Sequence, residues 1–180
     1  MKGRSLGILT VAAAAGLALA GLSPAPKDSD ATRAKATIEA RSGSTVTGTA
    51  EFTELSTGGV RAHVHVEKAP PGTHGLHIHE KGDCSDPEAK SAGGHFNPGS
   101  MEHAGPMSSK RHAGDLGNIE VKADGTGELE ISSDMLTVKA GPNSVAGRSV
   151  VFHEKADDFK TQPTGNAGGR LGCGVIVAPR

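Results

Sequence analysis

Two histidines separated by a single residue, His77 and His79, stand in the segment from Gly75 to Glu80. On an extended strand, side chains two residues apart project to the same face, so both imidazoles can reach one metal ion. The pair alone is weak evidence, because two solvent-exposed histidines on a strand have the same spacing. His63 and His65 form such a second pair, which we interpret as a solvated strand face. A role in metal capture is the alternative for that pair.

A glycine-rich stretch further along the chain carries more candidate ligands. His95, His103 and His112 follow one another at spacings of eight and nine residues, and Asp115 comes three residues later. Three imidazoles and one carboxylate suit a tetrahedral zinc site that needs no solvent ligand. A disordered histidine-rich loop is the alternative, although the glycines and prolines between these residues provide the bends that would bring them together.

His153 ends an apolar segment and can supply one more imidazole. Imidazole ligands without an available thiolate fit copper(II) and zinc. The residues therefore predict one or two bound ions, but they do not by themselves specify a reaction.

Cys84 and Cys173 are the only cysteines of the chain. In an exported protein, two cysteines favour one disulfide, because compartments outside the cytoplasm permit its formation. The bridge would close a loop of about 90 residues, worth roughly 4–5 kcal/mol in the chain-entropy model. Two unpaired thiols are the alternative.

The first 33 residues have a different composition from the rest of the chain. Lys2 and Arg4 precede an uncharged apolar run that ends in Ala18-Leu19-Ala20, which is typical of a secretory signal peptide. We expect residues 1–20 to be this signal, with an uncleaved anchor as the alternative, and residues 21–33 to be a flexible leader. Residues 34–180 would then form one domain, which after cleavage has no stable insertion in a membrane.

Short segments of alternating Val, Ile, Thr and Ala residues fill that domain, separated by turn residues. Eight such segments predict an all-β fold, an eight-stranded antiparallel Greek-key barrel or sandwich. Two long polar connections interrupt the pattern, from Cys84 to Gly117 and from Glu154 to Arg170, and we expect them to be functional. The expected strands are Ala34–Arg41, Ser44–Thr53, Val60–Glu67, Thr73–Glu80, Asn118–Ala123, Gly127–Ile131, Ser149–His153 and Leu171–Ala178.

Charge and aromatic content argue against a nucleic-acid partner. Without residues 1–20, the chain has 17 basic and 20 acidic residues, whereas general nucleic-acid binders are normally basic. The sequence has no Trp or Tyr and only four Phe, so stacking on bases is also unavailable.

Several motifs resemble those of copper/zinc superoxide dismutases. Residues 74–84, HGLHIHEKGDC, resemble the copper-site signature of that family, and the Gly82-Asp83-Cys84 ending resembles bacterial exported members. Residues 94–98, GHFNP, and 111–118, RHAGDLGN, resemble the zinc loop. Residues 153–158, HEKADD, and 164–176, TGNAGGRLGCGVI, resemble the C-terminal half of the family. The similarity runs from about residue 34 to the end in the family's order.

The resemblance implies a role for each candidate site residue. Copper would be held by His77, His79, His95 and His153. Zinc would be held by His95, His103, His112 and Asp115, so that the ring of His95 would bridge the two ions. Asp157 would link one copper ligand, His77, to one zinc ligand, His103; an exposed acid is its alternative reading. Arg170 would attract and orient a small anion beside the copper; a plain surface arginine is the alternative.

The implied reaction converts superoxide to oxygen and hydrogen peroxide, with His95 and Arg170 as catalytic residues and one copper and one zinc per chain. The protein would protect the periplasm, the cell envelope or the extracellular space, with Lys155 and Lys160 helping to steer the anion. Whether the protein forms a homodimer is left open.

Three rival functions are a metal-buffering module, an enzyme that uses copper alone and a structural or adhesive β-domain. The first would not need Arg170, the second would lack part of the zinc set, and the third would need no ligands.

Overall fold

Alternating burial marks the strands of this protein that have one solvated face. In the computed structural model, which describes residues 3 and 32–179, strand β1 (Arg33–Ala40) turns Ala34, Ala36 and Ile38 inward and its charged residues outward. Strand β3 (Val60–Glu67) alternates in the same way. A period of two with branched residues on one face is the pattern that a sheet with one solvated side requires.

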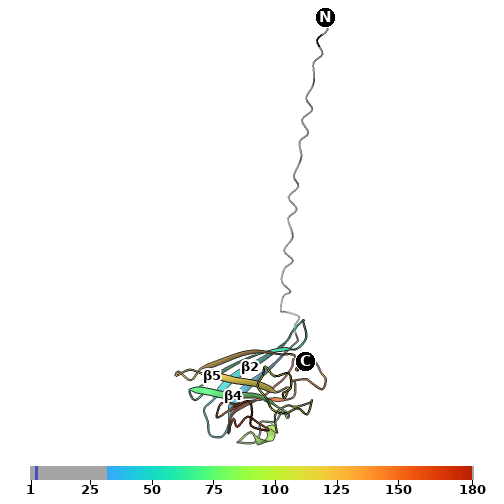
Figure 1. Cartoon of the computed structure of the whole chain (residues 1–180). Coiled ribbons are helices and arrows are strands. Elements are labelled where there is room, and N and C mark those ends of the chain that lie inside the picture. The colour runs from blue at the N-terminus through green and yellow to red at the C-terminus, as the bar shows by residue number, and fades with distance from the viewer. Residues whose placement is uncertain (1–2, 4–31, 180) are drawn as a thin grey trace.

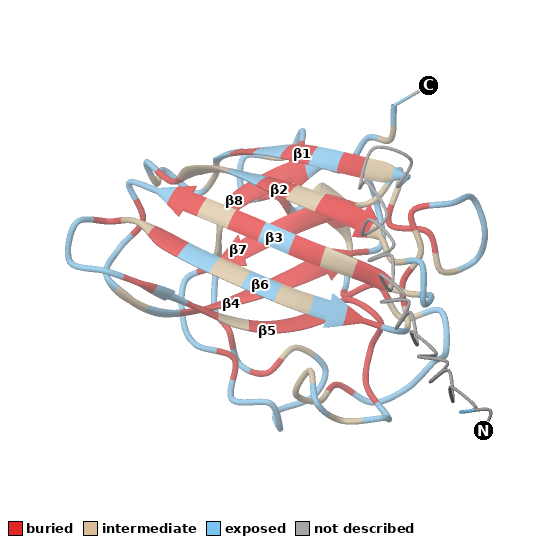
Figure 2. Cartoon of the chain, turned by 90° about the horizontal axis from the view of Figure 1, so that it is seen from above, coloured by how far each residue is buried: buried red, intermediate tan, exposed pale blue. Residues whose placement is uncertain are grey.

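The strands gather at one end of the picture in Figure 1, and Figure 2 labels them all: eight antiparallel strands close into one barrel in the order β1-β2-β3-β6-β5-β4-β7-β8. The chain passes from β3 to β4 and from β6 to β7 without pairing these consecutive strands, which is a Greek-key arrangement. The other strands are β2 (Thr47–Glu54), β4 (Gly72–His79), β5 (Asp115–Val121), β6 (Gly127–Ser133), β7 (Ser149–His153) and β8 (Arg170–Val175). The predicted all-β barrel with eight strands is therefore confirmed.

The barrel interior is packed mainly with small aliphatic side chains, together with Phe52 and Phe152. A smaller buried cluster, separate from this core, contains Ala89, Ala92 and Val151 with the two cysteines. It underlies the connection from β4 to β5, which contains a single turn of 3₁₀ helix, η2 (Lys90–Ala92). The connection therefore has a hydrophobic attachment of its own to the barrel wall.

The two long connections lie where the sequence predicts them, with shifted ends: the second ends at Gly169, because Arg170 already belongs to β8. Strand β5 begins at Asp115, three residues before the predicted start, because Asp115 continues the ladder with β4 by pairing with His77. The candidate ligand Asp115 thus sits on a strand and not in a loop. The predicted signal and nearly all of the predicted leader lie outside the described residues. No helix in the described part of the chain is long and apolar enough to cross a membrane.

Candidate metal centre

Strand β4 delivers two histidines to the barrel wall and buries both. All residues from His74 to His79 are buried, on both faces of the strand, because β5 and β7 flank it while the long connections cover its outer side. His153, at the end of the wholly buried strand β7, lies beside them. The Nε2 atoms of His79 and His153 are 3.3 Å apart.

The connection from β4 to β5 folds back over these three histidines. His95 pairs with His79 through an isolated β-bridge, and its ring centroid lies 3.9 Å from that of His77. Together they form what we call the first donor group, whose ligand atoms all lie within 4.8 Å of one another: His77, His79, His95 and His153.

A second donor group shares one member with the first. It consists of His95, His103, His112 and Asp115, again within 4.8 Å of one another and all buried. The Nδ1 atoms of its three histidines lie 2.9, 3.1 and 3.4 Å from the same Asp115 carboxylate oxygen. In a tetrahedral site with metal–ligand distances of about 2.0–2.2 Å, donor atoms are about 3.3–3.6 Å apart, so the group is close to zinc geometry.

Acceptors on the outer side of the rings orient them. His77 Nε2 donates to one oxygen of Asp157 at 2.8 Å, and His103 Nε2 donates to the other at 2.9 Å. His79 Nδ1 donates to the carbonyl of Gly93 at 2.9 Å. Each bond fixes a proton on the outer nitrogen and leaves the lone pair of the inner one directed into the centre.

Unpaired nitrogens provide an independent test of metal fit. Four inner nitrogens are buried without a hydrogen-bond partner: His77 Nδ1, His95 Nε2, His103 Nδ1 and His112 Nδ1. A buried polar atom without a partner is costly, and lone pairs that face one another at about 3.3 Å repel. Cations between them remove both costs, so the residues present fit one ion in each donor group.

Burial and carboxylates set the charge of the two groups in opposite directions. Burial holds the pKa of His79 and of His153 well below the usual value, and lowers that of His95 to about 4 against the opposing pull of Asp115. Burial would also lower the pKa of His103, but the nearby carboxylates of Asp115 and Asp157 outweigh that effect and raise the pKa to about 9. Burial therefore favours the neutral rings of His79, His95 and His153, whereas the two carboxylates favour the charged ring of His103.

Arg170 stands beside the first donor group. Its Nη1 donates to the carbonyl of Ala89 at 2.6 Å and its Nη2 to that of Gly93 at 2.7 Å. Gly93 also accepts the His79 hydrogen bond, so a single carbonyl separates the guanidinium from that ring. Burial lowers the pKa of Arg170, and Asp86 opposes the effect. The side chain is half-buried, fixed and able to face an anion.

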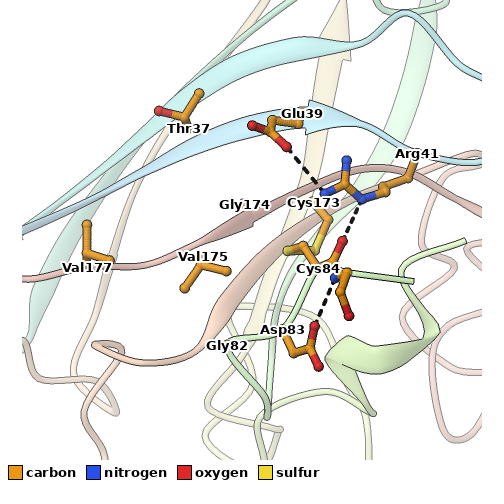
Figure 3. A pocket seen from close by; sticks show the side chains of 11 residues that line it. Thr37, Glu39, Arg41, Gly82, Asp83, Cys84, Cys173, Gly174, Val175 and Val177 are labelled. Atoms are coloured by element: carbon orange, nitrogen blue, oxygen red, sulfur yellow. Dashed lines mark hydrogen bonds and ion pairs between the residues drawn. A yellow bond between two sulfur atoms is a disulfide. The ribbon is translucent and has the colours of Figure 1, made fainter. Parts of the chain in front are cut away.

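The predicted disulfide is present between Cys84 and Cys173, with their Cα atoms 5.8 Å apart (Figure 3). It joins the connection that carries Ala89 and Gly93 to strand β8, which begins at Arg170. Arg41 Nε adds a hydrogen bond of 2.8 Å to the carbonyl of Cys84. The disulfide therefore links Arg170 to the segment that accepts its two hydrogen bonds.

Two amide side chains outside the predicted set hold this network in place. Asn118 on β5 exchanges two hydrogen bonds with the backbone of Asp157, at 2.8 and 3.0 Å. Gln162 accepts from His103 N and donates to His103 O, both at 2.8 Å. Asn118 lies in one of the motifs quoted above, but Gln162 lies in none of them, and no sequence pattern predicts its contact with His103. His63 and His65 lie elsewhere, on β3.

A β-barrel with two adjoining, imidazole-rich donor groups that share one histidine belongs to the class of two-metal β-barrel proteins. Comparison with known proteins narrows this class. A family model for copper/zinc superoxide dismutase matches residues 46–176. A crystal structure described as that of the clock protein EA4 is 39% identical, covers 83% of this chain and 96% of its own, and superposes with a TM-score of 0.74.

The chain belongs to the copper/zinc superoxide dismutase family, and is an oxidoreductase that uses copper and zinc. The family match and the two donor groups argue against the rival readings as a metal-buffering module or an adhesive domain.

Proposed function

We propose that this chain dismutates superoxide outside the cytoplasm, with one copper in the first donor group and one zinc in the second. Copper would be held by His77, His79, His95 and His153, and zinc by His95, His103, His112 and Asp115. The observation that carries the proposal is the membership of His95 in both groups, with Nδ1 toward Asp115 and the unpaired Nε2 toward the first group. The same ring would therefore bridge the two ions.

Bound copper supplies one-electron redox chemistry, which turns two superoxide anions and two protons into oxygen and hydrogen peroxide. Arg170 binds the anion: two of its five N–H groups are held by backbone carbonyls, and the others remain for the substrate. His95 holds a proton on Nε2 in one half of the cycle and releases it to the forming peroxide in the other. Asp157 keeps the rings of His77 and His103 in one orientation.

Export is the second part of the proposal. It is supported by the composition of residues 1–20 and by the disulfide, which is stable in compartments outside the cytoplasm. Superoxide of the periplasm, cell envelope or extracellular space is then the substrate. Lys155 and Lys160 are exposed residues of the connection after β7, which follows directly on His153, and would add to steering.

One preparation tests the chemistry. The purified protein should contain about one copper and one zinc per chain and should consume superoxide; a fully loaded sample that does not consume superoxide contradicts the enzymatic claim. The shared His95 is tested by loading Cu²⁺ into both groups. A bridging imidazole couples the two spins, so the electron paramagnetic resonance intensity should fall well below that of two isolated ions.

His95→Ala should restore the intensity of uncoupled Cu²⁺, whereas His63→Gln, a histidine outside both groups, should leave the coupling unchanged. Full intensity in the unsubstituted protein with both groups occupied would show that His95 does not bridge.

A further inference from the structure

His63 and His65 are the two histidines that are not buried, and they belong to neither donor group. All nine histidines lie in the described part of the chain, and the other seven are buried. His63 is exposed and His65 is partly exposed, both on the outer face of β3. In the barrel, β3 is separated from β4 by β6 and β5, so this pair lies across the molecule from the centre.

The register of the sheet surrounds the pair with carboxylates. His63 lies opposite Glu51 on β2 and Glu130 on β6, and His65 lies opposite Glu128 on β6. Directly opposed side chains on one face have Cβ atoms about 4.5–5.5 Å apart. Figure 2 shows β2, β3 and β6 side by side, with exposed positions alternating along β3 and β6. Two imidazoles and adjacent carboxylates thus share one solvent-facing patch.

The ring of His65 is already held between two carboxylates. Its Nε2 lies 3.4 Å from Glu67, and its Nδ1 lies 3.5 Å from Glu128. Nδ1 is nevertheless a buried atom with no hydrogen-bond partner. This combination of an imidazole nitrogen without a partner and neighbouring carboxylates is the arrangement that also surrounds the ligands of the metal centre.

Positive charge is confined to one end of the patch. Arg33 and Arg61 line the recess beside His63, together with Glu51 and Glu130, and Lys35 pairs with Glu51 at 2.7 Å. At the other end, His65 has Glu67 and Glu128 as its charged neighbours in ion-pair range. A cation is therefore favoured at the end with His65, Glu67 and Glu128, away from the two arginines.

We propose that His63 and His65 form an auxiliary site for a divalent transition-metal ion on the outer face of β3, with Glu128 and Glu130 as the neighbouring carboxylates. Histidines two residues apart on a strand are about 6.5–7 Å apart at Cα and can chelate one ion from the same face. Imidazole favours Cu²⁺ over Zn²⁺ in the general affinity order of divalent metals.

The site is looser than the metal centre. The two donor groups are the only sets of three or more donors within 4.8 Å in the described part of the chain. Binding at the patch therefore requires exposed side chains to turn toward a common point, which staggered rotamers permit. We expect an affinity well below that of the centre and rapid exchange with solvent.

Copper titration of the loaded protein tests the proposal. Protein that already holds one copper and one zinc is dialysed against CuCl₂, and bound metal is measured by mass spectrometry of the elements. One additional Cu²⁺ per chain is expected. His63→Gln and His65→Gln should each weaken that binding by ~10-fold or more, and the double variant should abolish it. Glu128→Gln should weaken it less.

Glu39→Gln, which removes an exposed carboxylate on β1, is the matched control and should bind the additional copper normally. Superoxide consumption and centre metal content should not change in any of these variants, which separates this site from the proposed enzyme. Electron paramagnetic resonance of the additional copper should show coupling to two imidazole nitrogens. Absence of a third ion, equal binding by the double variant, or loss in only one single variant would each overturn the paired site.

Discussion

Hydrogen bonds on the outer nitrogen decide what each imidazole of the centre can do. Asp157 serves His77 and His103, and the Gly93 carbonyl serves His79, so these three rings present lone pairs inward without having to reorganise. Arg170 shares the Gly93 carbonyl and is therefore held in register with the first donor group. Under the proposed function, metal ligation by His79 and substrate docking by Arg170 would thus depend on the same backbone carbonyl.

Arg170→Ala should lower kcat/KM for superoxide by about tenfold to a hundredfold while copper and zinc content stay unchanged. The reason is that a charge-assisted hydrogen bond contributes about 1.5–3 kcal/mol, and each 1.36 kcal/mol corresponds to a factor of ten in rate. Arg170→Lys should recover part of the loss, because lysine keeps the charge but not the two-pronged donor. Lys122→Ala, which removes a positive charge from the β5–β6 turn, is the control.

Steady-state kinetics at several ionic strengths, with metal analysis of each variant, provide the measurement. Loss of copper from Arg170→Ala would contradict a docking role and would make Arg170 a structural support of the first donor group.

Among the elements, the connection between β7 and β8 depends on a close contact at one glycine. Gly165 has a φ of +66°, and a methyl group at its Cα would collide with the carboxylate of Asp157 and lie 2.6 Å from His103 Nε2. Asp157 cannot easily move aside, because Asn118 holds its backbone and two histidines hold its side chain. The backbone of this connection thus packs directly onto the bond that orients a zinc-side ligand.

Gly165→Ala should weaken zinc binding by about 10–100-fold, the usual cost of losing a partner that orients a metal ligand. It should also lower the unfolding free energy by the cost of a left-handed alanine, about 1–2 kcal/mol. Gly43→Ala separates the two effects, since Gly43 has a φ of +71° and open space around its Cα. A zinc-chelator competition gives the affinity and denaturant unfolding gives the stability. Equal zinc affinities for the two variants would show that Gly165 does not support Asp157.

Strand patterns were readable from the sequence where one face of a strand meets solvent, and all eight predicted strands are present. The closure of the barrel is harder to predict from the sequence, because pairings such as β1 with β8 join residues that are far apart in the chain. The donor residues stand out by type and spacing. The Ala89 and Gly93 carbonyls that hold Arg170 do not, since any residue supplies a carbonyl and only the folded path of the connection selects these two.

At the scale of the whole molecule, the disulfide ties the connection between β4 and β5 to strand β8 of the barrel. Cys84 and Cys173 are 89 residues apart, and they belong to the small buried cluster beneath η2. Removing the bond frees the segment that carries the Ala89 and Gly93 carbonyls while leaving both donor groups chemically complete. Under the proposed function, this one covalent bond would couple the compartment of the protein to its stability and to substrate docking.

Two versions of the chain test this coupling: one produced with residues 1–20 and exported, the other begun at residue 21 and kept in a reducing cytoplasm. The exported protein should have lost residues 1–20 by mass and should contain no free thiol. The cytoplasmic protein should contain two free thiols and be less stable by up to roughly 4–5 kcal/mol, the loop-closure value for a bridge of this span. With metals loaded, the reduced form should also lose part of its kcat/KM, because Arg170 is no longer anchored.

Cys84→Ser combined with Cys173→Ser should reproduce the stability and rate of the reduced form in either compartment. Retained residues 1–20 would contradict the cleaved signal, whereas an equally stable and active double variant would limit the disulfide to a passive role.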